Sequence, residues 1–276
     1  EIMSSDWSSD VCSSDLILAG IAVEETIREQ LVFKGGTALK KCYFGDYRFS
    51  EDLDFSALPG APTGEPLASA VRRACGIAAD MLEEYTPVTI GCDRYEEKMP
   101  HPGGQEAFIV RARFPWHREP HVRVMIEVSI DEPIVRPTRR HSILHEYGEP
   151  IEMGIRTYDL VEIVAEKLRA ILQQARLLEQ RGWSRSRARD YYDLWRILST
   201  YGDRLETSGF TDLLRQKCAV REVAFDSLEA FFPQPMLAHV ERTWRQWLGP
   251  LVPDLPPFGV VQCELRPRLA DLFAEP

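Results

Sequence analysis

The stretch 33-FKGGTALKKCYFGDYRFSEDLDFS-56 opens with a double glycine and closes with two aspartates one residue apart. The apolar run at 31–33 stops at Gly35 and Gly36, which indicates a strand that enters a tight turn. Thr37 can then cap a short helix. Glycine at a strand-to-helix turn lets backbone N–H groups approach a phosphate, and the helix N-terminus adds positive potential. We therefore expect Gly35, Gly36 and Thr37 to cradle phosphate groups.

Residues 50–56 alternate between polar and apolar side chains, which predicts a half-buried strand. Asp52 and Asp54 would share one face of it, and Leu53 and Phe55 the other. Two carboxylates at this spacing lie within about 7 Å of each other and repel. A hard divalent cation such as Mg²⁺ neutralises them well. The alternative is a D-x-D pair on an exposed strand face with no ligand.

A third acid, Glu127, lies in the middle of the apolar run 121-HVRVMIEVSI-130. A lone carboxylate is costly to bury in such a strand. Glu127 is therefore a candidate third metal ligand, or a base for an attacking hydroxyl. An outward-facing position on an edge strand is the alternative, and Asp131, at the end of the run, is a weaker competitor. Metal-binding acids beside a phosphate cradle favour phosphoryl transfer.

Composition is that of a globular protein of 276 residues, 44% hydrophobic and 28% charged. The net charge of −10 offers no overall positive field for a polyanion. No apolar run is long enough to span a membrane. The six cysteines are scattered, without C-x-x-C pairs, and indicate reduced thiols in the cytoplasm.

The N-terminal residues 1–16 repeat Ser-Ser-Asp and lack the basic start and apolar segment of a signal peptide. The run DVCSSDL resembles a translated sequencing adapter. We expect these residues to be a non-native leader, or else a disordered Ser/Asp tail, and to lie outside the fold.

The order of periodic segments predicts an α+β protein with a mixed sheet flanked by helices over 17–150 and an all-α domain over 151–276. The expected strands of the first part are listed here: 31–33, 50–56, 86–92, 107–114 and 121–130. The expected helices are listed here: 17–30, 37–41, 67–84, 159–180 and 186–202.

Lys167 lies on an apolar face of the helix expected over 159–180, without an acid three or four residues away. This placement favours a positive contact for the phosphates of a triphosphate, with Arg169 as a second candidate. Asp190 and Asp193 share a face of the next helix. Asp190 can orient Lys167 or bind nucleotide, and Asp193 can instead form a helix-packing ion pair.

Arginines crowd the connection 176-RLLEQRGWSRSRARD-190, with Trp183 among them. Arg181, Arg185 and Arg187 are candidates to bind the phosphates of an RNA backbone, and a base could stack on the indole of Trp183. The alternative is a charged, solvated turn, or arginines that bind the triphosphate.

The motifs F-K-G-G-T-A-L-x-K and R-F-S-E-D-L-D-F resemble the AbiEii-type nucleotidyltransferases, toxins of abortive-infection and related toxin–antitoxin pairs. These belong to the DNA polymerase β-like superfamily, which shares a glycine turn, a paired-acid strand and a third acid on a later strand. The segments 166-EKLRA-170 and 189-RDYYDL-194 resemble later helices of the family, so the resemblance spans residues 31–195. Glu127 stands where relatives commonly have Asp, and its longer side chain can still reach a metal.

The resemblance implies a nucleotidyltransferase fold and transfer of a nucleoside monophosphate from an NTP to an acceptor hydroxyl. In this interpretation the three acids hold two Mg²⁺ ions, the glycine turn cradles the phosphates and Lys167 neutralises the leaving group. The implied acceptor is RNA, at the 3′ end of tRNA, and the implied role is a growth-arresting type IV toxin with an antitoxin encoded nearby. There are two alternatives. The acceptor can be a hydroxyl of a small molecule or a protein, or the chain can be a non-catalytic protein that binds nucleotide.

Overall fold

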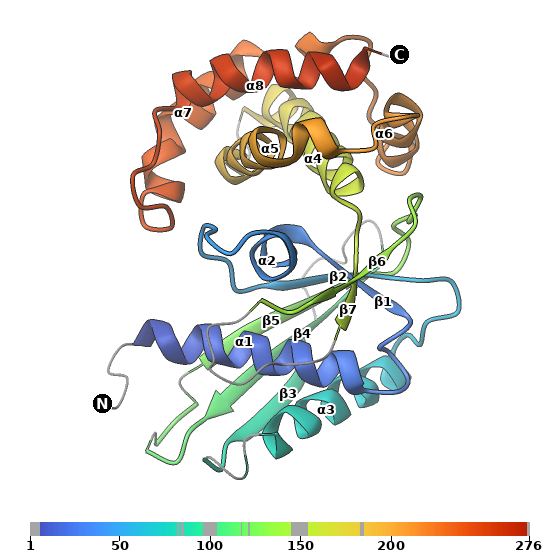
Figure 1. Cartoon of the computed structure of the whole chain (residues 1–276), viewed down its shortest axis with the longest axis vertical. Coiled ribbons are helices and arrows are strands. Elements are labelled where there is room, and N and C mark those ends of the chain that lie inside the picture. The colour runs from blue at the N-terminus through green and yellow to red at the C-terminus, as the bar shows by residue number, and fades with distance from the viewer. Residues whose placement is uncertain are drawn as a thin grey trace. The chain divides into compact units, whose positions relative to one another are not determined.

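The computed structural model divides the chain into two compact units, Glu1–Tyr158 and Asp159–Pro276 (Figure 1). We expected the boundary near residue 150. The structure describes residues 6–81, 83, 86–95, 104–116, 118–120, 122–144, 154–182 and 185–274, with the backbone alone for 6–13 and 122.

The first unit is built around a seven-stranded mixed sheet with the strand order β3-β4-β5-β2-β1-β7-β6. Its strands are β1 (Leu31–Lys34), β2 (Leu53–Ala57), β3 (Thr89–Tyr95), β4 (Gln105–Arg113), β5 (Val122–Ser129), β6 (Arg139–Ser142) and β7 (Gly154–Thr157). Its helices are α1 (Asp6–Val23), α2 (Gly35–Ala38) with a π-helical continuation (Leu39–Tyr43), and α3 (Glu65–Asp80). These elements agree with the expected α+β class.

The two faces of the sheet differ in chemistry because side chains alternate along each strand. One face carries the apolar core, with Phe33, Phe55 and Phe108 fully buried, and α1 and α3 lie on that side (Figure 1). The opposite face, on the side of α2, carries Asp54 and Glu127. We call it the acid face.

Two strands, β6 and β7, were not predicted. Their sequences, RRHS and GIRT, are short and carry arginines, so neither the apolar period nor β-branched residues mark them. They exist because β7 pairs with β1 in parallel and β6 pairs with β7, contacts that no local pattern reports. The strand expected over 86–92 is displaced to β3.

The described residues of the second unit form helices and no strand. The helices are α4 (Leu160–Arg181), α5 (Ala188–Tyr201), a 3₁₀ turn (Gly202–Arg204), α6 (Phe210–Ala219), a second 3₁₀ turn (Leu228–Phe231), α7 (Gln234–Leu248) and α8 (Phe258–Phe273). The side chain of Asp159 caps α4 by accepting the Val161 N–H, and Gly182, at φ +71°, ends it. Among the described helices, none combines the length and apolarity needed to cross a membrane.

The cysteines whose side chains are described are free thiols: Cys42, Cys75, Cys92, Cys218 and Cys263. Burial raises the pKa of the Cys42 thiol to about 12 and that of Cys218 to about 11. Both thiols therefore stay protonated near neutral pH, which fits packing residues better than reactive ones.

The segment expected to be a leader is helical from residue 6, as the first part of α1. Asp15 is buried and pairs with the equally buried Lys41, whose Nζ lies 2.6 Å from Asp15 Oδ1. A buried ion pair is costly to break from one side, because the remaining charge loses its partner. The origin of residues 1–16 stays a prediction, but Asp15 takes part in packing.

We predict that Asp15→Asn lowers the free energy of unfolding by about 3 kcal/mol, because Lys41 would be left buried without its counter-charge. Urea unfolding of the full chain measures this. The exposed Glu25→Gln, a matched loss of one acid, should change stability by less than about 0.5 kcal/mol. Equal stability of the two variants would show that the pair does not support the fold.

Candidate active site

Three charged residues lie side by side across the centre of the sheet. In the strand register Lys34 of β1 is opposite Asp54 of β2, and Asp54 is opposite Glu127 of β5. Residues that are directly paired in this way point to the same face. The tertiary fold therefore brings together two of the three expected acids and places a cation beside them.

Gly35 is required by the close approach of Asp54. It has φ +77°, a conformation that favours glycine, and a Cβ there would overlap the Asp54 carboxylate. At Gly36 a Cβ would overlap the guanidinium of Arg48 and lie 3.1 Å from Ser50 Oγ. The double glycine thus lets charged side chains lie directly against the backbone of the turn.

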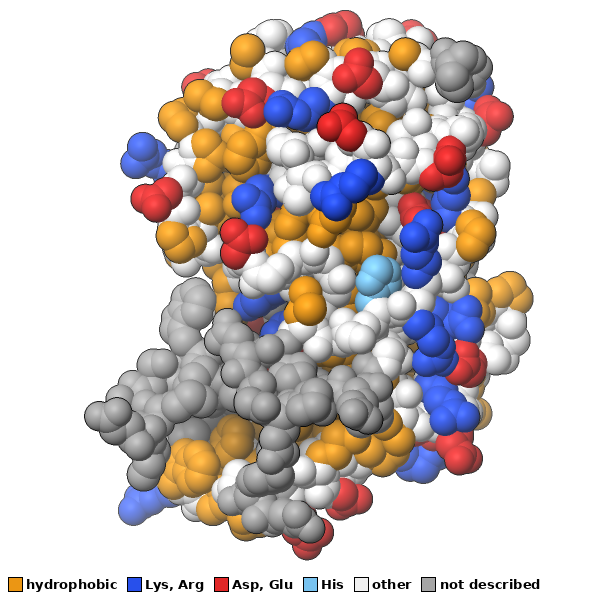
Figure 2. Space-filling view, viewed as in Figure 1, with side chains coloured by type: hydrophobic (Ala, Val, Ile, Leu, Met, Phe, Trp, Pro, Cys, Tyr) orange, Lys and Arg blue, Asp and Glu red, His pale blue; other side chains and the backbone are white. Residues whose placement is uncertain are grey.

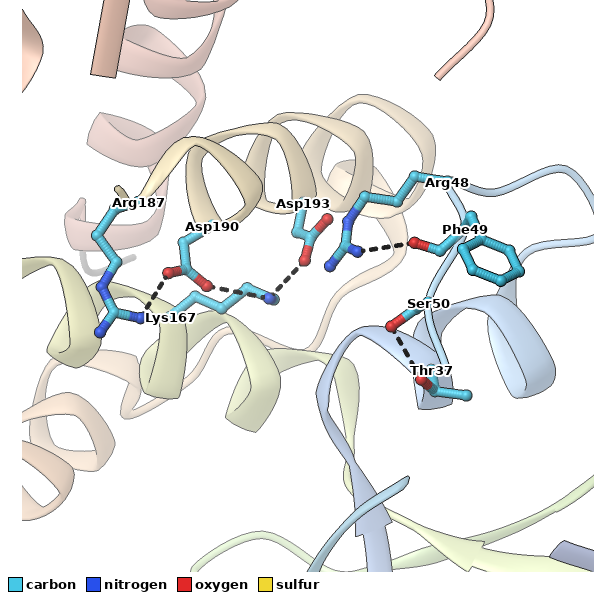
Figure 3. Close-up of polar contacts among 8 residues, drawn as sticks. All are labelled: Thr37, Arg48, Phe49, Ser50, Lys167, Arg187, Asp190 and Asp193. Atoms are coloured by element: carbon cyan, nitrogen blue, oxygen red, sulfur yellow. Dashed lines mark hydrogen bonds and ion pairs between the residues drawn. The ribbon is translucent and has the colours of Figure 1, made fainter. Parts of the chain in front are cut away.

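Thr37 holds the segment that leads into β2. Its buried hydroxyl donates to the Asp52 carbonyl oxygen at 2.6 Å. The same hydroxyl lies 2.9 Å from Ser50 Oγ (Figure 3). The hydroxyl expected to contact phosphate is therefore bonded within the protein. A phosphate contact by the Thr37 backbone N–H stays a prediction.

Asp52 lies outside the strand in which it was expected. β2 begins at Leu53, which pairs with Ile126 of β5, and its pairing with β1 begins one residue later, at Asp54 opposite Lys34. Neither ladder includes Asp52, so strand alternation does not set the direction of its side chain. The exposed Asp52 is thus not paired with Asp54 by strand geometry as we expected.

Arg48 was not among the sequence candidates. Its side chain is buried, lies over the ring of Tyr47 with 5.7 Å to the centroid, and donates from Nη1 to the Phe49 carbonyl oxygen at 3.3 Å (Figure 3). Its contact with Gly36 places a guanidinium at the glycine turn. Two sequence signals pointed to it: an arginine within the aromatic run 47-YRF-49, and the first position of the motif R-F-S-E-D-L-D-F.

Asp54 and Glu127 provide some of the ligands that a magnesium ion needs. Asp54 and Glu127 supply the carboxylate oxygens that Mg²⁺ prefers, and this ion commonly takes one or two protein carboxylates with water and phosphate completing its shell. Within the described part of the chain, no three His, Cys, Asp or Glu side chains are close enough together to hold a metal. The pair by itself suits one ion, and a set of three acids stays a prediction.

In the second unit Lys167 connects two helices. Its Nζ lies 2.6 Å from Asp193 Oδ2 and 3.3 Å from Asp190 Oδ1, and Arg187 Nη1 lies 3.0 Å from Asp190 Oδ2 (Figure 3). Lys167 and Asp193 are buried. Lys167 has no acid three or four residues away on its own helix, and the acids that it contacts here come from α5. Asp190 contacts Lys167 as expected, and Asp193 forms an ion pair with Lys167 that packs α5 against α4.

Arg169 and the expected RNA patch are arranged differently from Lys167. Residues two apart on a helix point to nearly opposite sides, and the charge of Arg169 partly offsets the rise that burial causes in the pKa of Cys218 of α6. Arg181 and Arg185 are exposed, whereas Arg187 is held by Asp190. Trp183 lies outside the described residues. The structure thus brings Arg187 to the carboxylate that also contacts Lys167, and the roles of all these arginines stay predictions.

Comparison with known protein families gives a match over nearly the whole chain. Residues 16–275 match the family described as "Nucleotidyl transferase AbiEii toxin, Type IV TA system". A search of curated proteins found no match.

We predict that Gly35→Ala lowers the free energy of unfolding by at least about 2 kcal/mol, since a left-handed alanine costs about 1–2 kcal/mol and its Cβ would also displace Asp54. Urea unfolding tests this. Gly76→Ala, on an exposed position of α3 with nothing within 4 Å of the added Cβ, should be neutral or stabilising by up to about 1 kcal/mol. Equal behaviour of both variants would contradict the close approach.

Proposed function

The chain belongs to the AbiEii family of nucleotidyltransferase toxins of type IV toxin–antitoxin systems, and we propose that it transfers a nucleoside monophosphate from an NTP to an acceptor hydroxyl on RNA. The observation that carries this proposal is the pairing of Asp54 with Glu127 beside the glycine turn. Two carboxylates on one sheet face next to a close-approach backbone turn suit a triphosphate and its cation.

Asp54 and Glu127 are the proposed metal ligands, and Asp52 is proposed as a third. A bound Mg²⁺ would polarise the phosphate under attack and offset the charge on the leaving pyrophosphate. The carboxylates orient the reacting groups, and one of them can accept the proton of the acceptor hydroxyl. Two ions remain the expectation from family resemblance, whereas the carboxylate pair by itself supports one.

The positive groups of the chain have separate proposed roles. The backbone N–H groups of Gly36 and Thr37 contact the phosphates, and Arg48, against Gly36, adds a cation at the same turn. Lys167 is proposed to contact the leaving pyrophosphate, with Asp190 orienting its amino group. Arg169 is a weaker candidate for nucleotide binding, because it points away from the Lys167 side of α4.

The remaining parts of the proposal come from the resemblance and from the sequence pattern. The resemblance supplies a DNA polymerase β-like catalytic fold, the 3′ end of tRNA as acceptor and an antitoxin encoded nearby. The helical periods supply an all-α C-terminal domain, and the scattered cysteines supply a cytoplasmic location. For the RNA contact we keep Arg181 and Arg185, and rank Arg187 below them because Asp190 already holds its guanidinium.

We predict that Asp54→Asn and Glu127→Gln each lower transfer on the order of a thousandfold, because each removes a carboxylate from the paired site. The assay incubates the full chain with Mg²⁺, total tRNA and each labelled NTP in turn. A chelator should abolish transfer and added Mg²⁺ should restore it. Asp80→Asn, an exposed acid at the end of α3, is the matched control and should keep full activity.

The same assay separates the alternatives. NTP binding without label on RNA would move the acceptor to a small molecule or a protein hydroxyl. Absence of NTP binding by the folded wild-type chain would refute the catalytic proposal.

A separate prediction concerns Lys167. Lys167→Met should destabilise the fold by about 3–5 kcal/mol, because Asp193 would be buried without its partner. Adding Asp193→Asn removes the stranded charge and should restore much of the stability. If Lys167 contacts the leaving pyrophosphate, the double variant stays inactive although it is folded; wild-type activity of the folded double variant would assign Lys167 a packing role alone.

A further inference from the structure

The acid face of the sheet continues beyond the acids as a row of arginines. In the register of β4 and β5, Ala107 is opposite Glu127, and four residues along the same strands Arg111 is opposite Arg123. Even spacing keeps these residues on the face that carries Asp54 and Glu127. The arginine pair therefore lies about 13 Å from Glu127 along the strands.

Placing two arginines directly opposite each other has a cost, since like charges at this spacing repel. Asp93 of β3 offsets part of it through an ion pair with Arg111 at 2.7 Å, but the side chains of Arg111 and Asp93 are 42% and 76% exposed. Arg123 is also exposed, and Arg113 extends the row by two residues. An exposed arginine row with one carboxylate is suited to binding phosphates, which guanidinium groups can contact through two parallel hydrogen bonds.

The far end of this row opens into a cavity of about 460 Å³. The residues that line it are Pro87, Thr89, Arg113, Phe114, Pro115 and Arg118. Trp116 stacks on Phe114, with ring centroids 5.1 Å apart and an interplanar angle of 14°, yet it is 67% exposed. An indole that is held in place by a ring and still open to solvent is a platform on which a base can stack.

These features occur in a protein with a net charge of −10. On the face drawn in Figure 2, Lys and Arg side chains are interspersed with Asp and Glu side chains. A general positive field therefore does not attract a polyanion, and local groups must do so. The arginine row and the indole of Trp116 beside it can provide this local attraction. Base stacking on an aromatic ring beside arginines tolerates many sequences and is typical of single-stranded nucleic acid binding.

We infer that a single-stranded segment of the acceptor RNA binds the unit that carries Asp54 and Glu127, with its phosphates on Arg111, Arg123 and Arg113 and a base on Trp116, just beyond the end of β4. The inference rests on the proposed function, and it names a surface on which this unit holds the acceptor. It differs from the expectation of an RNA contact at Arg181, Arg185 and Arg187.

The test measures binding of a labelled single-stranded oligoribonucleotide of about twelve nucleotides to the full chain at several salt concentrations. Each phosphate contact on a single strand contributes about 0.7 to the slope of log K against log salt. Arg111→Gln with Arg123→Gln should make the slope shallower by about 1.4 and weaken binding about 25-fold near 0.1 M salt. Trp116→Ala should weaken binding about five- to a hundredfold and leave the slope unchanged.

The matched control is Arg72→Gln with Arg215→Gln. Both arginines belong to exposed ion pairs, with Glu65 at 2.6 Å and with Asp212 at 3.2 Å, so the loss of charge is the same. This control should bind RNA as the wild type does. Arg111→Lys with Arg123→Lys keeps the charges and should restore most of the salt slope, which separates loss of charge from misfolding.

Unchanged binding and slope in the Arg111 and Arg123 double Gln variant would overturn the inference, as would an equal loss in the control. Failure of the proposed function is recognised separately. If the wild type binds the oligoribonucleotide through these residues but transfers no label from any NTP, the RNA-binding surface is supported and the proposed nucleotidyl transfer is refuted. If transfer to tRNA proceeds equally in the double Gln variant and the wild type, the reaction stands and this surface is not its acceptor path.

Discussion

The contact between the Asp54 carboxylate and the backbone of Gly35 is the constraint on which the rest of the site depends. A side chain at Gly35 would overlap that carboxylate, and the backbone there adopts a left-handed conformation. The turn ends β1 at Lys34, which lies opposite Asp54, and β2 pairs with β5 from Leu53 onward. The glycine turn thus lies directly beside the acid that the sheet aligns with Glu127.

The same turn explains how charge is distributed around the acids. Lys34 is paired in register with Asp54, and Arg48 lies against Gly36, so cations flank the carboxylate pair. Carboxylates held together need such compensation, because their repulsion is strong in a partly buried setting. Thr37 contributes by fixing the segment 50–52 through its hydroxyl rather than by offering that hydroxyl to a ligand.

In the second unit, α4 is held by ion pairs on two sides. Lys167 joins it to Asp190 and Asp193 of α5, while the fully buried Lys217 of α6 lies 2.7 Å from Glu162 and 3.3 Å from Glu166. Buried pairs of this kind contribute little net stability, but removal of one partner is costly. They fix the rotation of α4 about its axis and therefore the direction of Lys167.

The sequence alone determined the class of protein and the main chemical groups. The glycine turn, the D-x-D pair and Glu127 were identified from spacing and residue type, because turn residues and strand alternation are local properties. The family resemblance drawn from these motifs agrees with the match over residues 16–275. Long helices such as α4 and α5 were recognised from their apolar period.

Only the tertiary structure decided which of these groups meet. That Asp54 faces Glu127 and Lys34, that Asp52 falls outside β2 and that Arg48 reaches Gly36 are consequences of pairing between distant strands. The strands β6 and β7 and the row of arginines on the acid face depend on the same long-range register. Register is set by how the whole sheet buries its apolar face, and no short stretch of sequence contains that information.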